Sequence, residues 1–187
     1  MQAKKKAQLH LRVLLLMSLF ISLSIVFGKY LAFNLGEMLR VSFENLPILF
    51  AGFVLGPIAG LTVGVCADLL GCILVGYAIN PVVTLGAAAI GLCAGIAARL
   101  ARALPLSVRV CLTVFVSHFI GSVVIKTAGL AAFYNTSYPV LAIWRTLNYL
   151  LVGTAEGFLL FALLRSTVKD ALEKILKKQE RKADTTK

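Results

Sequence analysis

The sequence has little charge, and acidic residues are especially scarce. Only 14% of its 187 residues are charged, and 8 Asp and Glu stand against 19 Lys and Arg, for a formal net charge of +11. Hydrophobic residues make up 59% of the chain, and the mean hydropathy is +0.91. Because soluble domains average roughly 25% charged and 45–50% apolar residues, this composition argues against a soluble domain. It predicts an all-α integral membrane protein.

Sequence motifs for ATP hydrolysis, proteolysis and metal binding are also missing. The chain contains no GxxxxGK[ST] loop, no HExxH and no GxSxG. Its cysteines have no CxxC spacing and no nearby His, so we interpret them as packing residues. We therefore expect no catalytic residues, no metal and no cofactor, and a chain that depends on other subunits for energy.

Long apolar stretches predict a compact bundle of six transmembrane helices, since about 20 mostly apolar residues cross a bilayer as a helix. We expect these helices over Leu9–Phe33, Phe43–Leu55, Ile58–Val75, Val82–Leu100, Val108–Thr127 and Pro139–Leu164. We expect the intervening segments, including Asn34–Ser42 and Ala128–Ser137, to be loops. Residues 1–168 are interpreted as one transmembrane domain and residues 169–187 as a basic cytoplasmic tail.

The basic residues indicate the orientation of the bundle. They are concentrated in residues 4–12, 99–109 and 165–187. Cytoplasmic segments of membrane proteins are enriched in Lys and Arg, which predicts that both termini and the connection between the fourth and fifth helices are cytoplasmic. The same distribution argues against a basic face for nucleic acid.

Polar residues interrupt the apolar segments and gather toward the outward side. Asp68 lies near the middle of the third expected helix, where an ionised group costs several kcal/mol unless it faces a partner, water or a ligand. We predict a ligand pocket that opens outward and is lined by Arg40, Phe43, Glu44, Asn45, Asp68, Tyr77, Asn80, Arg145 and Asn148. The cations suit carboxylates, with Lys126 as a further candidate, and the aromatic rings suit a flat ligand.

Purely structural roles are the alternative for these polar residues. Asp68 would then pair with Arg145 or His118 and fix the bundle. Glu156 and His118 lie deeper, and we interpret them as a hydrogen bond between helices rather than a proton relay.

Several motifs together resemble the substrate-binding S components of energy-coupling factor (ECF) vitamin transporters. These are FENLPI (43–48), the Gly56-Pro57 break, ADLLG (67–71), GYAINP (76–81) and TLG (84–86), and the resemblance is closest to the folate-specific S components. It implies a subunit without enzymatic activity that captures folate with high affinity at the extracytoplasmic face of a prokaryotic plasma membrane. A transmembrane scaffold subunit (EcfT) and two cytoplasmic ATPase subunits (EcfA-type) would drive uptake.

The resemblance also implies a contact surface on the first helix. In this family small residues there contact the scaffold subunit, and Ser18, Ser22, Ser24 and Gly28 stand at the matching positions. Other readings stay open at this point. They are an S component for thiamine, riboflavin or pantothenate, an intramembrane enzyme acting on a lipid, and a structural membrane subunit that binds no small ligand.

Overall fold

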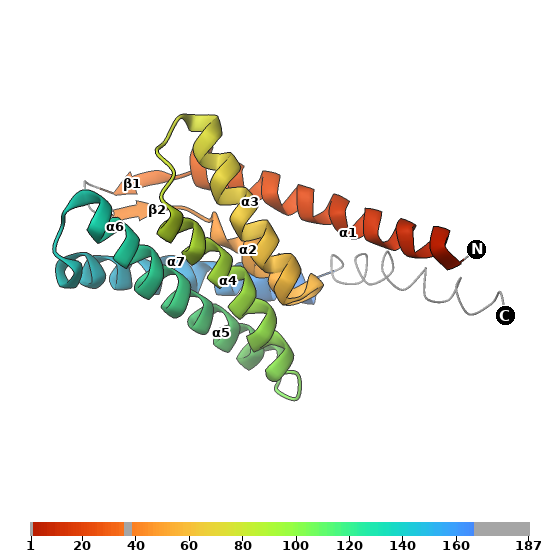
Figure 1. The fold of residues 1–187 in the computed structure, drawn as a ribbon. Helices are drawn as coiled ribbons and strands as arrows, with labels where there is room; N and C mark the ends of the chain where they lie inside the picture. Colours follow the sequence, from red (N-terminus) through yellow and green to blue (C-terminus); the bar gives the residue numbers. More distant parts are fainter. Residues whose placement is uncertain (1, 36–38, 167–187) are drawn as a thin grey trace.

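The computed structural model describes residues 2–35 and 39–166, which form a bundle of helices with one small β-hairpin (Figure 1). The helices are α1 (Gln2–Ile25), η1 (Val26–Tyr30), α2 (Asn45–Leu55), α3 (Pro57–Val75), α4 (Pro81–Leu100), α5 (Leu106–Ser117), η2 (His118–Lys126), α6 (Thr127–Tyr134) and α7 (Tyr138–Arg165). The two η segments are π-helical and continue α1 and α5 without a break. The predicted tail, residues 169–187, lies outside the described residues.

Within the described residues, five helical runs are long and apolar enough to cross a membrane, judged by length and composition. They are His10–Tyr30, Pro57–Val75, Pro81–Leu100, Leu106–Tyr134 and Tyr138–Arg165. The second expected helix is present as α2, but its 11 residues are too few to span a bilayer alone. The structure thus confirms an all-helical membrane bundle in its main features, with five long helices and one short one.

Two connections differ from the sequence prediction. The expected loop after the first helix contains the strands β1 (Phe33–Leu35) and β2 (Leu39–Val41), which pair in antiparallel fashion with Phe33 opposite Val41. Most of the expected loop 128–137 is helical, because the sequence TAGLAAFY of α6 is rich in residues that favour a helix. That helix ends where Asn135 adopts a left-handed conformation, with φ of 51°.

The turns on either side of α3 follow from local sequence. Gly56 has φ of 106°, a value that side chains disfavour, and Pro57 begins α3 where a missing N–H does no harm. Gly76 ends α3 in the left-handed region, with φ of 70°. Asn80 then caps α4, because its Oδ1 accepts a hydrogen bond of 3.0 Å from the backbone N–H of Val82.

Helix α4 lies at the centre of the bundle, where it contacts α2, α3, α5, η2 and α6. Glycines permit these close approaches. A Cβ at Gly91 would collide with the backbone of Gly60, and one at Gly64 would collide with the carbonyl of Ala87. Small residues at such positions let helices in a membrane pack backbone to backbone.

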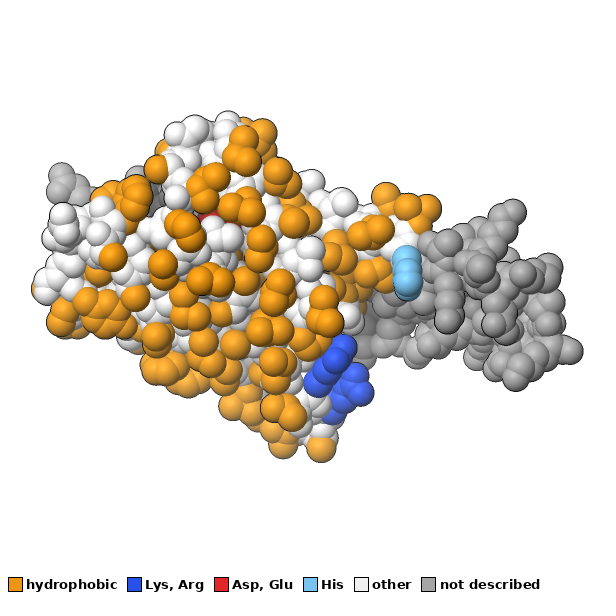
Figure 2. All heavy atoms as spheres, viewed as in Figure 1, with side chains coloured by type: hydrophobic (Ala, Val, Ile, Leu, Met, Phe, Trp, Pro, Cys, Tyr) orange, Lys and Arg blue, Asp and Glu red, His pale blue; other side chains and the backbone are white. Residues whose placement is uncertain are grey.

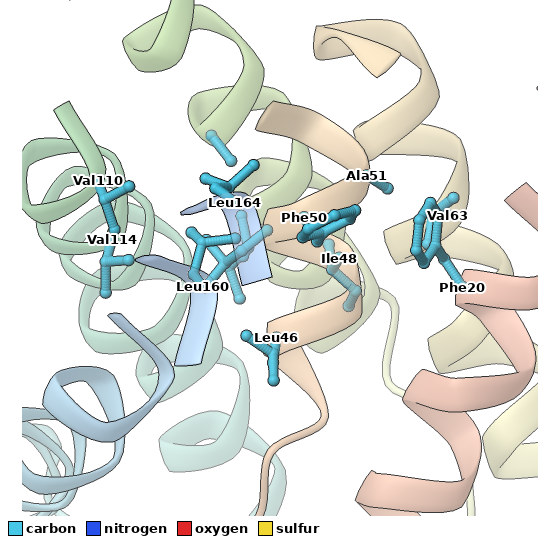
Figure 3. Packing of buried hydrophobic residues seen from close by; sticks show 13 residues of the cluster. Phe20, Leu46, Ile48, Phe50, Ala51, Val63, Val110, Val114, Leu160 and Leu164 are labelled. Atoms are coloured by element: carbon cyan, nitrogen blue, oxygen red, sulfur yellow. The ribbon is translucent and has the colours of Figure 1, made fainter. Parts of the chain in front are cut away.

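A hydrophobic core joins the helices around α2 (Figure 3). Phe20 of α1 packs against Phe50 of α2, with ring centroids 5.3 Å apart, and Leu160 of α7 is fully buried on the other side. The outer surface is also largely apolar in Figure 2, with Lys and Arg side chains gathered near the turn between α4 and α5. Helix α1 begins and α7 ends at the same end of the bundle (Figure 1).

The close contact between α3 and α4 predicts that Gly91→Ala destabilises the protein. The new methyl group would press on the backbone of Gly60, and overpacking of this kind costs about 1–3 kcal/mol. Gly157→Ala is the matched control, because the nearest atom to a Cβ there is 3.7 Å away. We expect thermal unfolding in detergent to show a lower midpoint for Gly91→Ala alone, and equal midpoints for the two variants would contradict the packing described.

Candidate ligand-binding site

Polar side chains from α1, η1, α2, α3 and η2 meet inside the bundle. They surround a cavity of about 10 Å³, which holds roughly one water molecule. Its lining consists of Ser24, Ile25, Lys29, Glu44, Ile48, Ala67, Asp68, Ala87 and Lys126. Lys29 and Glu44 flank the β1–β2 hairpin in the sequence, so the cavity lies near the base of that hairpin.

Lys126 is the buried cation of this group, with only 4% of its surface exposed. Its Nζ donates to Oε1 of Glu44 at 3.1 Å and to Oδ1 of Asn45 at 3.4 Å. These bonds join η2 to the start of α2, more than 80 residues earlier in the chain. A buried ammonium group in a membrane protein needs such partners, because its desolvation is costly.

Asp68 is held by a different partner from those considered in the sequence. Oγ1 of Thr84 donates to Oδ2 of Asp68 at 2.7 Å, which links α3 to α4. The alternative pairing of Asp68 with Arg145 or His118 is wrong for the described part of the chain. Arg145 donates instead to the hydroxyl of Tyr149, and His118 pairs with Glu156.

The end of α1 closes the cavity on its other side. Oγ of Ser24 donates to the backbone carbonyl of Glu44 at 2.6 Å, and Nζ of Lys29 lies 5.4 Å from the ring centroid of Tyr77. Gly28 is buried against Glu44, whose Oε2 would be 2.8 Å from a Cβ at this position. Glycine is therefore required for the Glu44 side chain to fit.

The four small residues predicted to contact a scaffold subunit fall into two groups. Ser24 and Gly28 are buried and face the polar cluster, whereas Ser18 and Ser22 are exposed. The hydroxyls of Ser18 and Ser22 donate to carbonyls four residues earlier in α1. Of these four predicted contact residues, only Ser18 and Ser22 are therefore accessible to another subunit.

Both lysines of the cavity lie on π-helical segments. Lys29 belongs to η1, and Lys126 is the last residue of η2. Each residue added to a helix rotates the following side chains by about 100°, given 3.6 residues per turn. Wider π turns are frequent at functional sites, and here they set the direction of the two cations.

A second set of interacting polar side chains lies on α7 and η2. Nη2 of Arg145 donates to the Tyr149 hydroxyl at 3.1 Å, and the Tyr149 ring stacks on His118 at 5.0 Å. His118 Nε2 lies 2.7 Å from Oε2 of Glu156, which confirms the predicted hydrogen bond between helices. His118 and Lys126 lie on the same segment, η2, so these side chains and the cavity share one element.

The predicted pocket residues are thus distributed unevenly. Glu44 and Asp68 line the cavity. Asn45 does not line it but accepts a hydrogen bond from Lys126, which does. The amide group of Asn80 caps α4 and donates to the carbonyl of Gly129 at 2.9 Å, so it already has partners in the fold. The remaining residues do not line the cavity in the described part of the chain: Phe43, Arg145 and Asn148 are half-buried, and Tyr77 is exposed. The side chain of Arg40 lies outside the described part.

Sequence reasoning missed Lys29, Ser24 and Thr84 as members of this site and gave Lys126 only a minor place. Lys126 carried the same signal as Asp68, since it is an ionisable residue inside a 29-residue apolar helix. Ser24 and Thr84 carried no comparable signal, because hydroxyl groups are common in membrane helices and often bond to their own backbone.

We expect Lys126→Met to destabilise the protein by about 1–3 kcal/mol, because Glu44, whose side chain is 27% exposed, loses its cation. The double variant Glu44→Gln, Lys126→Met should lose at least 1 kcal/mol less than the sum of the single variants, as expected for contacting residues. Arg102→Met, at an exposed position outside the cavity, is a control for loss of one positive charge. Unfolding in mixed micelles measures these energies, and strict additivity would show that Lys126 and Glu44 do not act as a pair.

Comparisons with known proteins agree with this architecture. A family model described as "ECF transporter, substrate-specific component" matches residues 12–177. Among solved structures, the chain is similar to FolT bound with folic acid, with a TM-score of 0.65 and 20% identity over 80% of this chain and 90% of that one. No curated protein sequence matches the chain significantly. With most of its length matched, the chain belongs to the family of substrate-specific components of ECF transporters.

Proposed function

We propose that the chain is the folate-binding S component of an ECF transporter, with the polar cluster around Glu44, Asp68 and Lys126 as its ligand site. The observation that carries this proposal is the meeting of two lysines and two carboxylates in one cavity of an apolar bundle. A membrane protein buries such charges at substantial cost, which favours a binding function over simple packing. The likeness in fold to FolT supports folate as the first ligand to test.

The cluster offers groups that match each part of a folate. A pterin has a guanidine-like edge, which suits a carboxylate acceptor such as Asp68 or Glu44. The glutamate tail carries carboxylates, which suit Lys29, Lys126 or the neighbouring Arg145. Tyr77 and Tyr149 supply faces on which flat rings stack. The other residues that we propose to contact the ligand are Arg40, Phe43, Asn45, Asn80 and Asn148.

The cavity must enlarge before it can accept a vitamin. Its volume of about 10 Å³ is far below the roughly 300–1,000 Å³ of pockets that hold small molecules. We propose that the ligand takes the place of one partner in the Lys126–Glu44 pair and displaces the β1–β2 hairpin. The binding energy then has to offset the loss of that ion pair.

We propose a prokaryotic plasma-membrane subunit with six membrane helices, both termini in the cytoplasm and a basic tail over residues 169–187. Its energy would come from an EcfT scaffold subunit and two EcfA-type ATPases. Ser18 and Ser22, which are exposed on α1, would contribute to the scaffold contact.

Mass spectrometry of the small molecule that co-purifies with the chain tests the proposed ligand directly. Folate is expected in a 1:1 ratio with the protein. Thiamine, riboflavin or pantothenate in its place would keep the transporter assignment and overturn the folate specificity. A purified chain that never binds any of these vitamins would overturn the proposed function as a whole.

For the site itself, we expect Asp68→Asn to weaken folate binding at least about 30-fold, since losing a charged hydrogen-bond partner at a buried site costs about 2 kcal/mol or more. Trp144 is the chain's one tryptophan and precedes Arg145, so its fluorescence is a convenient measure of binding. Asp170→Asn makes the same chemical change in the tail and should bind folate normally. Equal affinities for the two variants would remove Asp68 from the site.

A further inference from the structure

A long, mostly apolar groove lies between α5 and η2 on one side and α7 on the other, and it shares no lining residue with the polar cavity. It encloses about 450 Å³. Its lining extends from Ser107 to Val123 on one side and from Thr146 to Phe161 on the other. At about 1.5 Å per residue, these stretches are roughly 22–24 Å long. The groove therefore follows the helices through most of the approximately 30 Å thickness of the hydrocarbon layer.

The shape and lining of the groove favour an alkyl chain. Gly153 and Gly157 leave its floor open, and the atoms nearest to a Cβ at Gly157 are the methyl groups of Val114, at 3.7 and 4.0 Å. Phe115 and Phe158 form outer walls and are 62% and 73% exposed. A transmembrane helix is about 10–12 Å wide and would rest on these walls, whereas an acyl chain can lie between them.

One end of the groove carries a positive charge. Phe161 lines the groove at the end of α7, and the guanidinium carbon of Arg165 lies 6.0 Å from the centre of its ring. Arg165 is exposed and available to an anion. The exposed hydroxyl of Ser107, at the start of α5, lines the same end. An Arg side chain at the boundary of the hydrocarbon layer is well suited to a lipid phosphate.

We propose that this groove binds one anionic phospholipid, with an acyl chain between α5 and α7 and its phosphate beside Arg165. The apolar groove determines where the chain lies, and Arg165 selects a negatively charged headgroup. The groove and the polar cavity have no lining residue in common, but Tyr149, proposed above to stack on the vitamin, also lines the groove.

Native mass spectrometry of the full-length chain tests this proposal, with phosphatidylglycerol and phosphatidylcholine of identical acyl chains as competing probes. The wild type should retain one phosphatidylglycerol under conditions that remove other lipids. Arg165→Gln should reduce the preference for phosphatidylglycerol about fivefold, the effect expected for one basic residue near an anionic lipid. Arg102→Gln is the matched control, since Arg102 is also exposed but does not line the groove.

A second pair of variants tests the place of the acyl chain. Gly157→Leu fills the groove and should reduce retention of both lipids, whereas Ala162→Leu places the same side chain at an exposed position of α7 outside it. Equal unfolding midpoints establish that both variants are folded. Unchanged lipid retention in Gly157→Leu and Arg165→Gln would overturn the proposal. Loss of a co-purifying scaffold subunit from Gly157→Leu, with lipid retention unchanged, would instead identify the groove as a docking site for a helix and also overturn it.

Discussion

The contact of glycine backbones between α3 and α4 is the constraint on which the rest of the structure depends. Gly60 and Gly91 meet without side chains between them, and Gly52 of α2 approaches the same carbonyl of Gly91. Three helices are thereby brought into contact along one line. In a bilayer there is little hydrophobic driving force between helices, so this close packing has to supply much of the attraction.

The polar cluster is a consequence of that packing. With α2, α3 and α4 in contact, Glu44 at the start of α2 bonds to Lys126, and Thr84 of α4 bonds to Asp68 of α3, which lines the same cavity. The same charges would be prohibitively costly if the helices were further apart and each group faced lipid. The charged site thus depends on the apolar packing, because closely packed helices exclude lipid and allow the charged groups to pair with one another.

Much of the fold follows from the sequence, because long apolar runs, the Gly56-Pro57 break and the Asn80-Pro81 cap each have a direct local cause. The π-helical segments have no such local cause in the sequence. We attribute the one at η2 to its packing against α4 and α7. The site was therefore only partly predictable. Glu44 and Asp68 stood out as charges in apolar surroundings, but the direction of Lys126 required knowing the helix register. Ser24 and Gly28 illustrate the same limit, because spacing alone did not distinguish the outer face of α1 from the inner one.

The small size of the polar cavity has a further meaning for a protein that sits permanently in a membrane. A row of charges through a bundle can conduct protons or ions if water fills the space between them. Here the cavity has room for about one water, and both Lys126 and Asp68 are already bonded to neighbouring side chains. The closed site is therefore expected to act as an electrical seal, which limits the leakage of ions through the bundle.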